Sequence, residues 1–335
     1  MATKKLYSIG VIGDGAWGTT LAILLAEKGH AVTIWSAFPD NVRECTHCRE
    51  NVKFLPGIRI PDSVGFSSDL KNVIHSSELI LLAVPSQYLM GVLKKLKTCA
   101  YKGKPLVSVV KGIDPATLMT MSQLIQKQLG TIALAVLSGP TIAIEVAKKI
   151  PTTAVIASTN IKLAKELQDV FSCGYFRIYT NSDVRGVELC GSVKNVIALA
   201  CGVCDGLGFG TNTKAALLTR GLVEMTRLGK VLKAKPGTFT GLTGLGDLAT
   251  TCFSPNSRNR SVGYELGQGK SIAAILATMD SVAEGVHTAK AVYFLARKLG
   301  LEMPITTAVY NIIYKKIPAR NAVNDLMSRT LKKES

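Results

Sequence analysis

A glycine-rich turn that directly follows an apolar stretch constrains the fold of this chain more than any other feature. Residues 6–12 are apolar and β-branched, and the turn after them reads Gly13-Asp14-Gly15-Ala16-Trp17-Gly18. Residues 19–28 have the composition of a helix, and residues 31–35 that of a second strand. Strand, G-x-G-x-x-G turn, helix and strand within about 30 residues form the dinucleotide-binding fingerprint, in which the second glycine lets a pyrophosphate approach the backbone.

Apolar runs continue through the first half of the chain and alternate with segments of helical composition. Beyond the first two, the runs that predict strands are residues 79–84, 106–110, 132–137, 153–157 and 176–179. Strands that alternate with helices form a parallel sheet with helices on both faces. We therefore expect an α/β chain that begins with a Rossmann-like, doubly wound sheet, whose ligands bind beyond the carboxyl ends of the strands.

The second half of the chain has a different pattern, with helical periodicity almost throughout. Ser182 or Asp183 is a plausible cap for a long helix that runs towards Cys204. Further helices are expected near residues 211–232, 260–278, 286–299 and 305–317. The chain is long enough for two cores. We predict a dinucleotide-binding domain over residues 1–188 and an all-helical substrate and catalytic domain over residues 189–335.

Three of the predicted strand ends stand out: Pro85-Ser86, Lys111-Gly112 and Ser138-Gly139-Pro140-Thr141, with plain turn residues as the alternative for the two prolines. Lys111 follows the apolar run of residues 106–110, so its ammonium is expected to project at the strand tip over the cofactor crevice. A solvated loop lysine is the alternative reading. Gly139 and Thr141 follow the next strand, in the sequence Ser-Gly-Pro-Thr. The carboxyl ends of neighbouring parallel strands therefore bring these residues to the cofactor side of the sheet.

The sequence after the second strand does not decide between NAD and NADP. An NAD site usually has an acidic residue there, to bond the ribose hydroxyls, whereas an arginine accommodates the 2′-phosphate of NADP. Here Ser36, Ala37 and Phe38 follow the strand, and none of them is acidic or basic. Asp40 and Arg43 come slightly late. The sequence is therefore compatible with either NAD or NADP as the cofactor.

One lysine in the helical half lies in unusually apolar surroundings. From Leu189 to Cys204 there are 16 residues and one charge, that of Lys194. Burial disfavours an ammonium, so its pKa is expected to be lowered, and such a lysine can exchange a proton with an alcohol or carbonyl oxygen. A lysine that snorkels to water is the alternative. Asn195 is either a core amide or a substrate ligand, and Asp247 either orients Lys194 or caps a helix.

A glycine-rich segment further along the chain is typical of an anion site. Gly241, Gly244 and Gly246 are expected to allow close approach and positive φ angles, and the loop after Asp247 leads to Arg258, Asn259 and Arg260. Free backbone N–H groups followed by a guanidinium and an amide suit a phosphate or carboxylate. The segment therefore indicates a small phosphorylated substrate.

The net charge of the chain is 40 − 23 = +17. Its basic residues are scattered, which favours attraction of anionic metabolites over nucleic-acid binding. We expect no membrane-spanning run, reduced cysteines and a cytoplasmic location. The pairs Cys45/Cys48 and Cys201/Cys204 have C-x-x-C spacing. They fall in different predicted domains, and the second pair lies in an apolar helix, so no metal site is expected.

Taken together, these motifs resemble the bacterial type of NAD(P)-dependent glycerol-3-phosphate dehydrogenase. The resemblance covers nearly the whole chain, in order. The motifs that carry it are GDGAWGT (13–19), VVKGID (109–114), LSGPTIAIEVA (137–147), GSVKNVIALACG (191–202), TGLGDLATTCFSPNSRN (243–259) and AEGVHT (283–288). It implies an oxidoreductase that interconverts sn-glycerol 3-phosphate and dihydroxyacetone phosphate with NAD or NADP, supplies phospholipid synthesis, and forms a homodimer.

The resemblance also implies roles for individual residues. Lys194 would be the general acid/base, assisted by Asp247 and Lys111. The residues implied around the substrate are Lys111, Gly139, Thr141, Lys194, Asn195, Asp247, Thr251, Ser257, Arg258 and Asn259. Those implied around the cofactor are Gly13, Gly15, Ala16, Trp17, Gly18, Ala37, Lys111, Ala143, Arg258, Val282 and Glu284. The chain departs from the family at Ala16, where serine is common, and at Ala37, where a basic residue is common.

Two other functions fit parts of the pattern. A related two-domain dehydrogenase that acts on a hydroxy acid would have the same architecture and would bind a carboxylate in place of a phosphate. A non-catalytic NAD(P) sensor that binds nucleic acid would use the basic surface, and its DNA binding would depend strongly on salt. Only the net charge supports the sensor.

Overall fold

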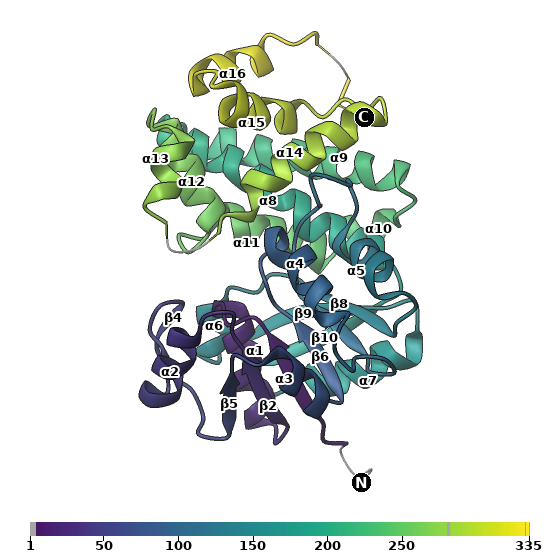
Figure 1. Ribbon diagram of the computed structural model, residues 1–335. Coiled ribbons are helices and arrows are strands. Elements are labelled where there is room, and N and C mark those ends of the chain that lie inside the picture. Colours follow the sequence, from purple (N-terminus) through teal and green to yellow (C-terminus); the bar gives the residue numbers. More distant parts are fainter. Residues whose placement is uncertain (1–4, 280–281, 332, 335) are drawn as a thin grey trace. The chain divides into compact units, whose positions relative to one another are not determined.

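The structure is a computed structural model of the chain (Figure 1), and it describes residues 5–279, 282–331 and 333–334. Its strands form an eight-stranded sheet and a separate two-stranded sheet. The expected architecture, a Rossmann-like sheet followed by a helical part, is confirmed. The elements form two compact units, and each unit is described by itself.

The first unit consists of Met1–Lys111 and Met119–Glu188, and the second of Gly112–Leu118 and Leu189–Ser335. The division falls within one continuous helix, α8 (Val184–Gly206). The carboxylate of Asp183 caps this helix, because its Oδ1 accepts a hydrogen bond of 3.0 Å from the backbone N–H of Gly186. The long helix that the sequence predicts is therefore present, with Asp183 as its cap.

The sheet of the first unit has the strand order β10-β9-β8-β7-β6-β1-β2-β5. Its strands are β1 (Ser8–Ile12), β2 (Ala31–Trp35), β5 (Val64–Ser67), β6 (Leu79–Leu82), β7 (Leu106–Ser108), β8 (Leu134–Ser138), β9 (Thr152–Ala157) and β10 (Phe176–Asn181). A separate antiparallel pair is formed by β3 (Glu50–Asn51) and β4 (Leu55–Arg59). Every strand predicted from the sequence is present, with ends that differ by at most two residues. The strands β3, β4 and β5 were not predicted.

Helices lie on both faces of this sheet, as expected for a doubly wound fold (Figure 1). They are α1 (Ala16–Glu27), α2 (Pro39–Cys48), α3 (Leu70–Ser76), α4 (Ser86–Leu96), α5 (Met121–Leu129), α6 (Ala143–Ala147) and α7 (Ile161–Phe171). Alternate residues of β6 face opposite sides: Leu79 and Leu81 pack with α1 and α7, whereas Ile80 and Leu82 pack with α3, α4 and α5. The near-continuous apolar strands therefore fill two cores.

One strand pair departs from the expected parallel sheet. All neighbouring strands pair in parallel except β8 and β9, which are antiparallel, with Leu137 opposite Ile156. The helix between them, α6, has five residues and is about 7.5 Å long. That length is too short to carry the chain back along β8, a strand of five residues that spans roughly 17 Å. The chain therefore turns at the carboxyl end of β8 and runs back beside it.

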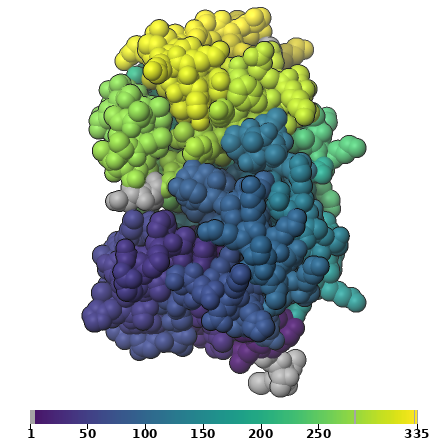
Figure 2. Space-filling view, viewed as in Figure 1, coloured from purple at the N-terminus to yellow at the C-terminus, as the bar shows by residue number. Residues whose placement is uncertain are grey.

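The second unit is helical. After α8 come α9 (Thr211–Val231), α10 (Pro236–Phe239), the π-helical turn η1 (Leu242–Gly246), α11 (Asp247–Phe253), α12 (Arg258–Gly267), α13 (Ile272–Ala277), α14 (Glu284–Lys298), α15 (Pro304–Lys315) and α16 (Ala319–Met327). The yellow surface of this unit belongs to its last helices (Figure 2). Met327, at the end of α16, is largely exposed. The prediction of a single helix near residues 260–278 is wrong. The chain forms α12 and α13 there, because Gly269 at φ +89° follows the end of α12 and Ser271 caps α13.

Helix α8 runs through the apolar core of the second unit. It is long and apolar enough to cross a membrane by length and composition, so the expectation that the sequence holds no such run is wrong. Its apolar window is completely buried in the structure, as in the core helix of a globular protein. The helix is apolar on all sides because other helices surround it.

Glycines bring α8 and α12 into backbone contact. A Cβ atom at Gly202 would lie 2.0 Å from the carbonyl oxygen of Arg260, and one at Gly263 would lie 2.1 Å from that of Leu199. Only glycine fits at such positions, so the two helices pack at the closest separation that their main chains permit. The packing fixes α12 against the C-terminal part of α8.

A buried carboxylate caps α15 from another helix. Glu224 of α9 accepts hydrogen bonds from the backbone N–H groups of Ile305 and Thr306, at 2.6 and 3.2 Å, and from the Thr306 hydroxyl. Burial raises the pKa of Glu224 above its usual value of 4.5, although these hydrogen bonds oppose the change. The folded state therefore holds this proton more tightly than the unfolded chain does.

This raised pKa predicts a specific pH dependence of stability. Relative to a Glu224→Gln variant, the free energy of unfolding of the wild type should fall as pH rises from about 4.5 through the raised pKa, by about 1.4 kcal/mol per unit of pKa difference. The reason is that the unfolded glutamate ionises first. Urea denaturation of both proteins across this pH range measures the difference. Parallel curves for the two proteins would contradict the prediction.

Candidate functional site

The glycine turn between β1 and α1 leaves room for a ligand. Gly13 has φ +119°, and a Cβ atom there would lie 2.7 Å from the carbonyl oxygen of Ala83. A Cβ atom at Gly18 would lie 2.4 Å from the carbonyl oxygen of Gly13, so both glycines are required by the packing of the chain itself. A Cβ atom at Gly15 would meet nothing within 4 Å. Gly15 therefore lies beside open space at the start of α1.

This open space fits the pyrophosphate of a dinucleotide. Gly15 is the N-cap residue of α1, and among the described residues no side chain caps the helix. The first N–H groups of a helix and its dipole favour an anion at that position. Both the free space and the unused donors therefore suit a phosphate group, as the sequence predicts.

A Gly15→Val substitution should weaken dinucleotide binding without unfolding the protein. The valine side chain would fill the open space, and the extended backbone of Gly15 (φ −65°, ψ 169°) accepts a β-branched residue. We expect the dissociation constant for the dinucleotide to rise at least about tenfold, or about 1.4 kcal/mol. Calorimetric titration measures it. Gly91→Val, at another position with no neighbour within 4 Å, is the control and should bind normally.

The predicted residues at the ends of β7 and β8 lie together. The Nζ atom of Lys111 donates a 3.2 Å hydrogen bond to the carbonyl oxygen of Gly139, and the hydroxyl of Thr141 donates to the same oxygen. Lys111 is half-buried, so it is not a freely solvated loop lysine. Gly139 has φ +146°, and its Cβ atom would lie 3.0 Å from the Cα of Ala154.

The other residues predicted to contact the cofactor in the first unit surround the glycine turn. Trp17 lies in the first turn of α1 and packs edge-on against Phe176, with ring centroids 6.1 Å apart. Ala143 begins α6, and its carbonyl oxygen accepts a 3.3 Å hydrogen bond from Thr20 of α1. Ala37 is exposed beyond the end of β2. Trp17 is thus part of α1, and Ala143 is joined to α1 by one hydrogen bond.

In the second unit, Lys194 is buried in an ion pair. Its side chain is 7% exposed, and its Nζ atom lies 2.5 Å from Oδ1 of Asp247, whose side chain is 2% exposed. The Thr251 hydroxyl is a further hydrogen-bond partner of the same Nζ atom. The alternative interpretation, in which Lys194 snorkels to water, is therefore wrong, because the ammonium stays inside the protein. Of the two readings of Asp247, the partner of Lys194 is the one that the contacts support.

The glycine-rich segment before Asp247 forms a π-helical turn. The N–H of Gly246 donates to the carbonyl oxygen of Gly241, 3.2 Å away, and a Cβ atom at Gly244 would lie 1.9 Å from the carbonyl oxygen of Phe239. The expected close approach is therefore present at Gly244. The expected positive φ angles are wrong, because Gly241, Gly244 and Gly246 all have negative φ. The turn widens the helix by one residue just before Asp247.

Residues 257–259 lie at the start of α12. Ser257 is the N-cap residue, and its Oγ accepts a hydrogen bond from the backbone N–H of Arg260. Arg258 is the exposed first residue of the helix. Asn259 is buried, and its Oδ1 accepts a 2.9 Å hydrogen bond from the N–H of Gly285. These contacts fix the N-terminus of α12, which itself favours anions and where Arg258 is the first residue.

The start of α14 approaches the same place. A Cβ atom at Gly285 would lie 2.7 Å from the carbonyl oxygen of Asn195 and 2.8 Å from Oδ1 of Asn259. Although the Arg258 side chain is exposed as a whole, desolvation lowers the pKa of its guanidinium, and the Glu284 carboxylate opposes this change. Arginine stays protonated even so. The structure therefore brings Asn195, Asn259 and the start of α14 together. Val282 lies in the connection just before α14.

Some of the candidate residues have other roles. Arg260, which follows the predicted anion-binding pair, is held by Asp205 through a 2.7 Å ion pair, and Lys214 pairs with the same carboxylate at 3.0 Å. Cys201 and Cys204 are buried in the core around α8. Within the described part of the chain, no group of three or more His, Cys, Asp or Glu residues could hold a metal ion.

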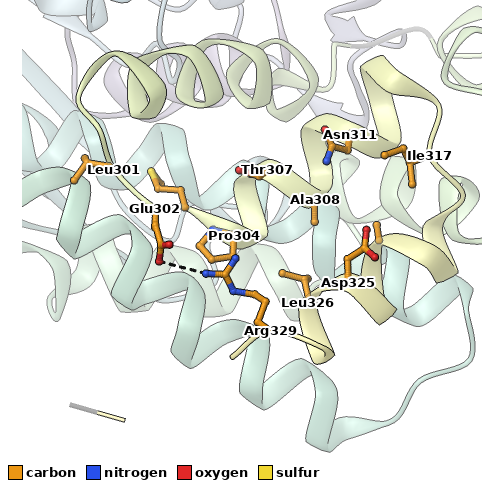
Figure 3. A pocket seen from close by; sticks show the side chains of 12 residues that line it. Leu301, Glu302, Pro304, Thr307, Ala308, Asn311, Ile317, Asp325, Leu326 and Arg329 are labelled. Carbon is orange, nitrogen blue, oxygen red and sulfur yellow. Dashed lines mark hydrogen bonds and ion pairs between the residues drawn. The ribbon is translucent and has the colours of Figure 1, made fainter. Parts of the chain in front are cut away.

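A pocket of about 220 Å³ lies between α15, its preceding loop and α16 (Figure 3). Glu302 and Arg329 form an ion pair of 3.3 Å beside it, and Thr307, Asn311 and Leu326 also line it. None of the residues predicted to contact substrate or cofactor lines this pocket. The candidate chemistry therefore lies elsewhere, at the two clusters described above.

Sequence reasoning missed one polar cluster at the end of β2. The carboxylate of Asp14 accepts hydrogen bonds from the Ser36 hydroxyl and from the Asn41 amide, at 2.5 and 2.6 Å. The signal was present in the acidic residue between the first two glycines of the fingerprint. The glycine pattern alone does not show that Asp14 lies beside the residues that follow β2.

Comparison with family models places the chain in a dehydrogenase family along most of its length. The model of the NAD-dependent glycerol-3-phosphate dehydrogenase N-terminus matches residues 8–164, and the model of the C-terminus of the same family matches residues 183–324. A glycerol-3-phosphate dehydrogenase [NAD(P)+] of Geobacter sp. (strain M21) is 49% identical over 329 residues, which cover 97% of this chain and 98% of the relative.

Solved structures give the same result. The crystal structure of glycerol-3-phosphate dehydrogenase from Coxiella burnetii superposes with a TM-score of 0.94 at 38% identity, covering 97% of this chain and 99% of that one. A D-mandelate dehydrogenase superposes with a TM-score of 0.61 at 14% identity, covering 96% of this chain and 100% of that one. That lower identity shows a shared fold alone.

Proposed function

The chain belongs to the NAD-dependent glycerol-3-phosphate dehydrogenase family, and we propose that it interconverts sn-glycerol 3-phosphate and dihydroxyacetone phosphate with NAD or NADP. Curated relatives at 49% identity carry this activity in their names. The observation that carries the proposal is the buried pair of Lys194 and Asp247, with Thr251 beside it. A buried ammonium fixed in one place is the group that a carbonyl reduction needs.

The proposed general acid/base is Lys194. In the direction of reduction its Nζ atom gives a proton to the substrate oxygen at C2, and in the direction of oxidation it takes that proton back. Asp247 orients the ammonium through the 2.5 Å ion pair, and Thr251 holds it from a second side. Lys111 contributes a second positive charge that polarises the carbonyl group. A bound nicotinamide supplies or accepts the hydride.

The proposed phosphate site is the start of α12. Arg258 binds the phosphate through charge-assisted hydrogen bonds, and the N-terminus of α12 adds its dipole. The remaining substrate contacts are proposed for Gly139, Thr141, Asn195, Thr251, Ser257 and Asn259. Binding energy from the phosphate then positions the reacting carbon, which raises the rate and not only the affinity.

The cofactor contacts are proposed along the glycine turn and at the start of α14. In the first unit they are Gly13, Gly15, Ala16, Trp17, Gly18, Ala37, Lys111 and Ala143. In the second they are Arg258, Val282 and Glu284. The functional division into a cofactor-binding part, residues 1–188, and a catalytic part, residues 189–335, belongs to the same proposal, as do a supply of glycerol 3-phosphate to phospholipid synthesis, a homodimer and a cytoplasmic location.

The direct test is spectrophotometric. Purified protein should oxidise NADH or NADPH, observed as loss of absorbance, when dihydroxyacetone phosphate is added. The same assay with 2-oxo acids in its place tests the alternative, a hydroxy-acid dehydrogenase of the same fold. Turnover with the oxo acids and none with dihydroxyacetone phosphate would overturn the proposal.

A further inference from the structure

The glycine turn places a carboxylate at the end of β2. The N–H of Gly13 donates a 3.0 Å hydrogen bond to the carbonyl oxygen of Trp35, the last residue of β2, so the turn and the strand end are joined. Asp14 follows Gly13, and its Oδ2 accepts hydrogen bonds from Ser36, at 2.5 Å, and from Asn41, at 2.6 Å. The acid that the sequence lacks after β2 is therefore supplied from the neighbouring turn.

Several contacts hold this carboxylate in one position. Ser36 also accepts a 3.0 Å hydrogen bond from the N–H of Phe38, which fixes the chain after β2. The amide of Asn51 donates to the backbone oxygen of Asp14, at 2.7 Å, and to the Thr19 hydroxyl, at 2.9 Å. Asp14 is 8% exposed, and among the described residues no hydrogen bond reaches its Oδ1. Within the described part of the chain, that oxygen is an acceptor without a protein donor.

The charges around the end of β2 are unsuited to an additional phosphate. Ala37, directly beyond the strand, is uncharged. The two arginines of the next segment have acidic partners: Arg43 forms an ion pair with Asp40, and Arg49 forms one with Asp62. A 2′-phosphate at this place would lie beside the Asp14 carboxylate, and like charges brought together cost several kcal/mol.

We propose that Asp14 makes this protein selective for NAD over NADP. The end of the second strand is where dinucleotide-binding sheets receive the adenosine ribose, and a carboxylate there accepts hydrogen bonds from the ribose hydroxyls. Asp14 supplies the carboxylate, and Ser36 and Asn41 position it. This inference rests on the proposed function for its cofactor class, and it adds the residue that chooses between the two cofactors.

The test is a binding titration without substrate. The chain has two tryptophans, Trp17 in the turn and Trp35 at the end of β2, so quenching of intrinsic fluorescence reports binding at this place. Wild-type protein should bind NADH at least about tenfold more tightly than NADPH. Asp14→Asn keeps the size of the side chain and removes its charge, and it should lower this ratio at least about tenfold, chiefly by tighter binding of NADPH.

The controls separate the inference from the proposed function. Glu44→Gln removes one exposed carboxylate from α2 and should leave the ratio of the two dissociation constants unchanged. Asp14→Ser is a second variant with the same expected direction, should Asp14→Asn fail to fold. A wild type that prefers NADPH, or an unchanged ratio in the folded Asp14 variant, would overturn the inference while leaving the proposed reaction intact. Binding of neither dinucleotide would overturn both.

Discussion

Turnover should fall about 10²- to 10⁴-fold when Lys194 is replaced by alanine, while the affinity for the dinucleotide stays the same. The proposed proton donor is removed, while Asp247 and Thr251, which hold it in the wild type, stay in place. Single-turnover reduction of dihydroxyacetone phosphate measures the chemical step, and fluorescence titration measures cofactor binding. Near-normal turnover with unchanged cofactor affinity would contradict the proposed role.

This variant needs a control for stability, because it removes the Lys194 ammonium from the buried Asp247 carboxylate. Loss of one member of a buried ion pair destabilises a protein by about 3–5 kcal/mol. Lys214 forms another largely buried pair with Asp205, with side chains 14% and 13% exposed, although Asp205 keeps Arg260 as a second partner. Lys214→Ala should therefore lower the free energy of unfolding by less than Lys194→Ala does, and it should keep turnover near the wild-type value. The comparison separates the loss of a charge pair from the loss of a proton donor.

Replacing Arg258 with alanine should lower kcat/KM for dihydroxyacetone phosphate by roughly 30- to 5,000-fold, or about 2–5 kcal/mol. The guanidinium is the proposed partner of the substrate phosphate, and saturating cofactor should restore little of the loss. Steady-state kinetics with dihydroxyacetone phosphate and with unphosphorylated dihydroxyacetone measure the effect. The variant and the wild type should differ far less on the unphosphorylated compound.

An exposed arginine elsewhere in the second unit provides the control. Arg320→Ala removes the same charge from α16 and should leave kcat/KM for both compounds unchanged. Equal losses on the phosphorylated and unphosphorylated compounds in Arg258→Ala would contradict a phosphate contact. Such a result would assign Arg258 to cofactor binding or to the packing of α12.

Features set by local pattern could be predicted from the sequence. The apolar runs of β1 and β6 have the length and composition of buried strands, and the glycines after β1 fix the turn. The burial of Lys194 followed from the 16 residues around it, which hold no other charge. β5 was missed because its short sequence, Val64–Ser67, is mostly half-buried at the sheet edge and lacks a strong apolar signal.

Features set by contacts between distant segments could not be predicted. The antiparallel pairing of β8 and β9 depends on how far the connection between them reaches, which composition does not give. The glycines of η1 allow many backbone conformations, so their presence alone did not indicate a π-helical turn. The position of Asp14 beside Ser36 and Asn41 likewise appears only once the turn and the end of β2 are joined.

The glycine contacts between α8 and α12 have a consequence for the choice of substrate. Lys194 belongs to α8 and Arg258 to α12, and main-chain atoms, not flexible side chains, set how close the two helices lie. If Lys194 exchanges the proton of the reacting oxygen and Arg258 binds the phosphate, the spacing of the two helices sets the length of carbon chain that fits between them. Substrates one carbon longer or shorter should then be rejected by length, even when they carry the same two functional groups.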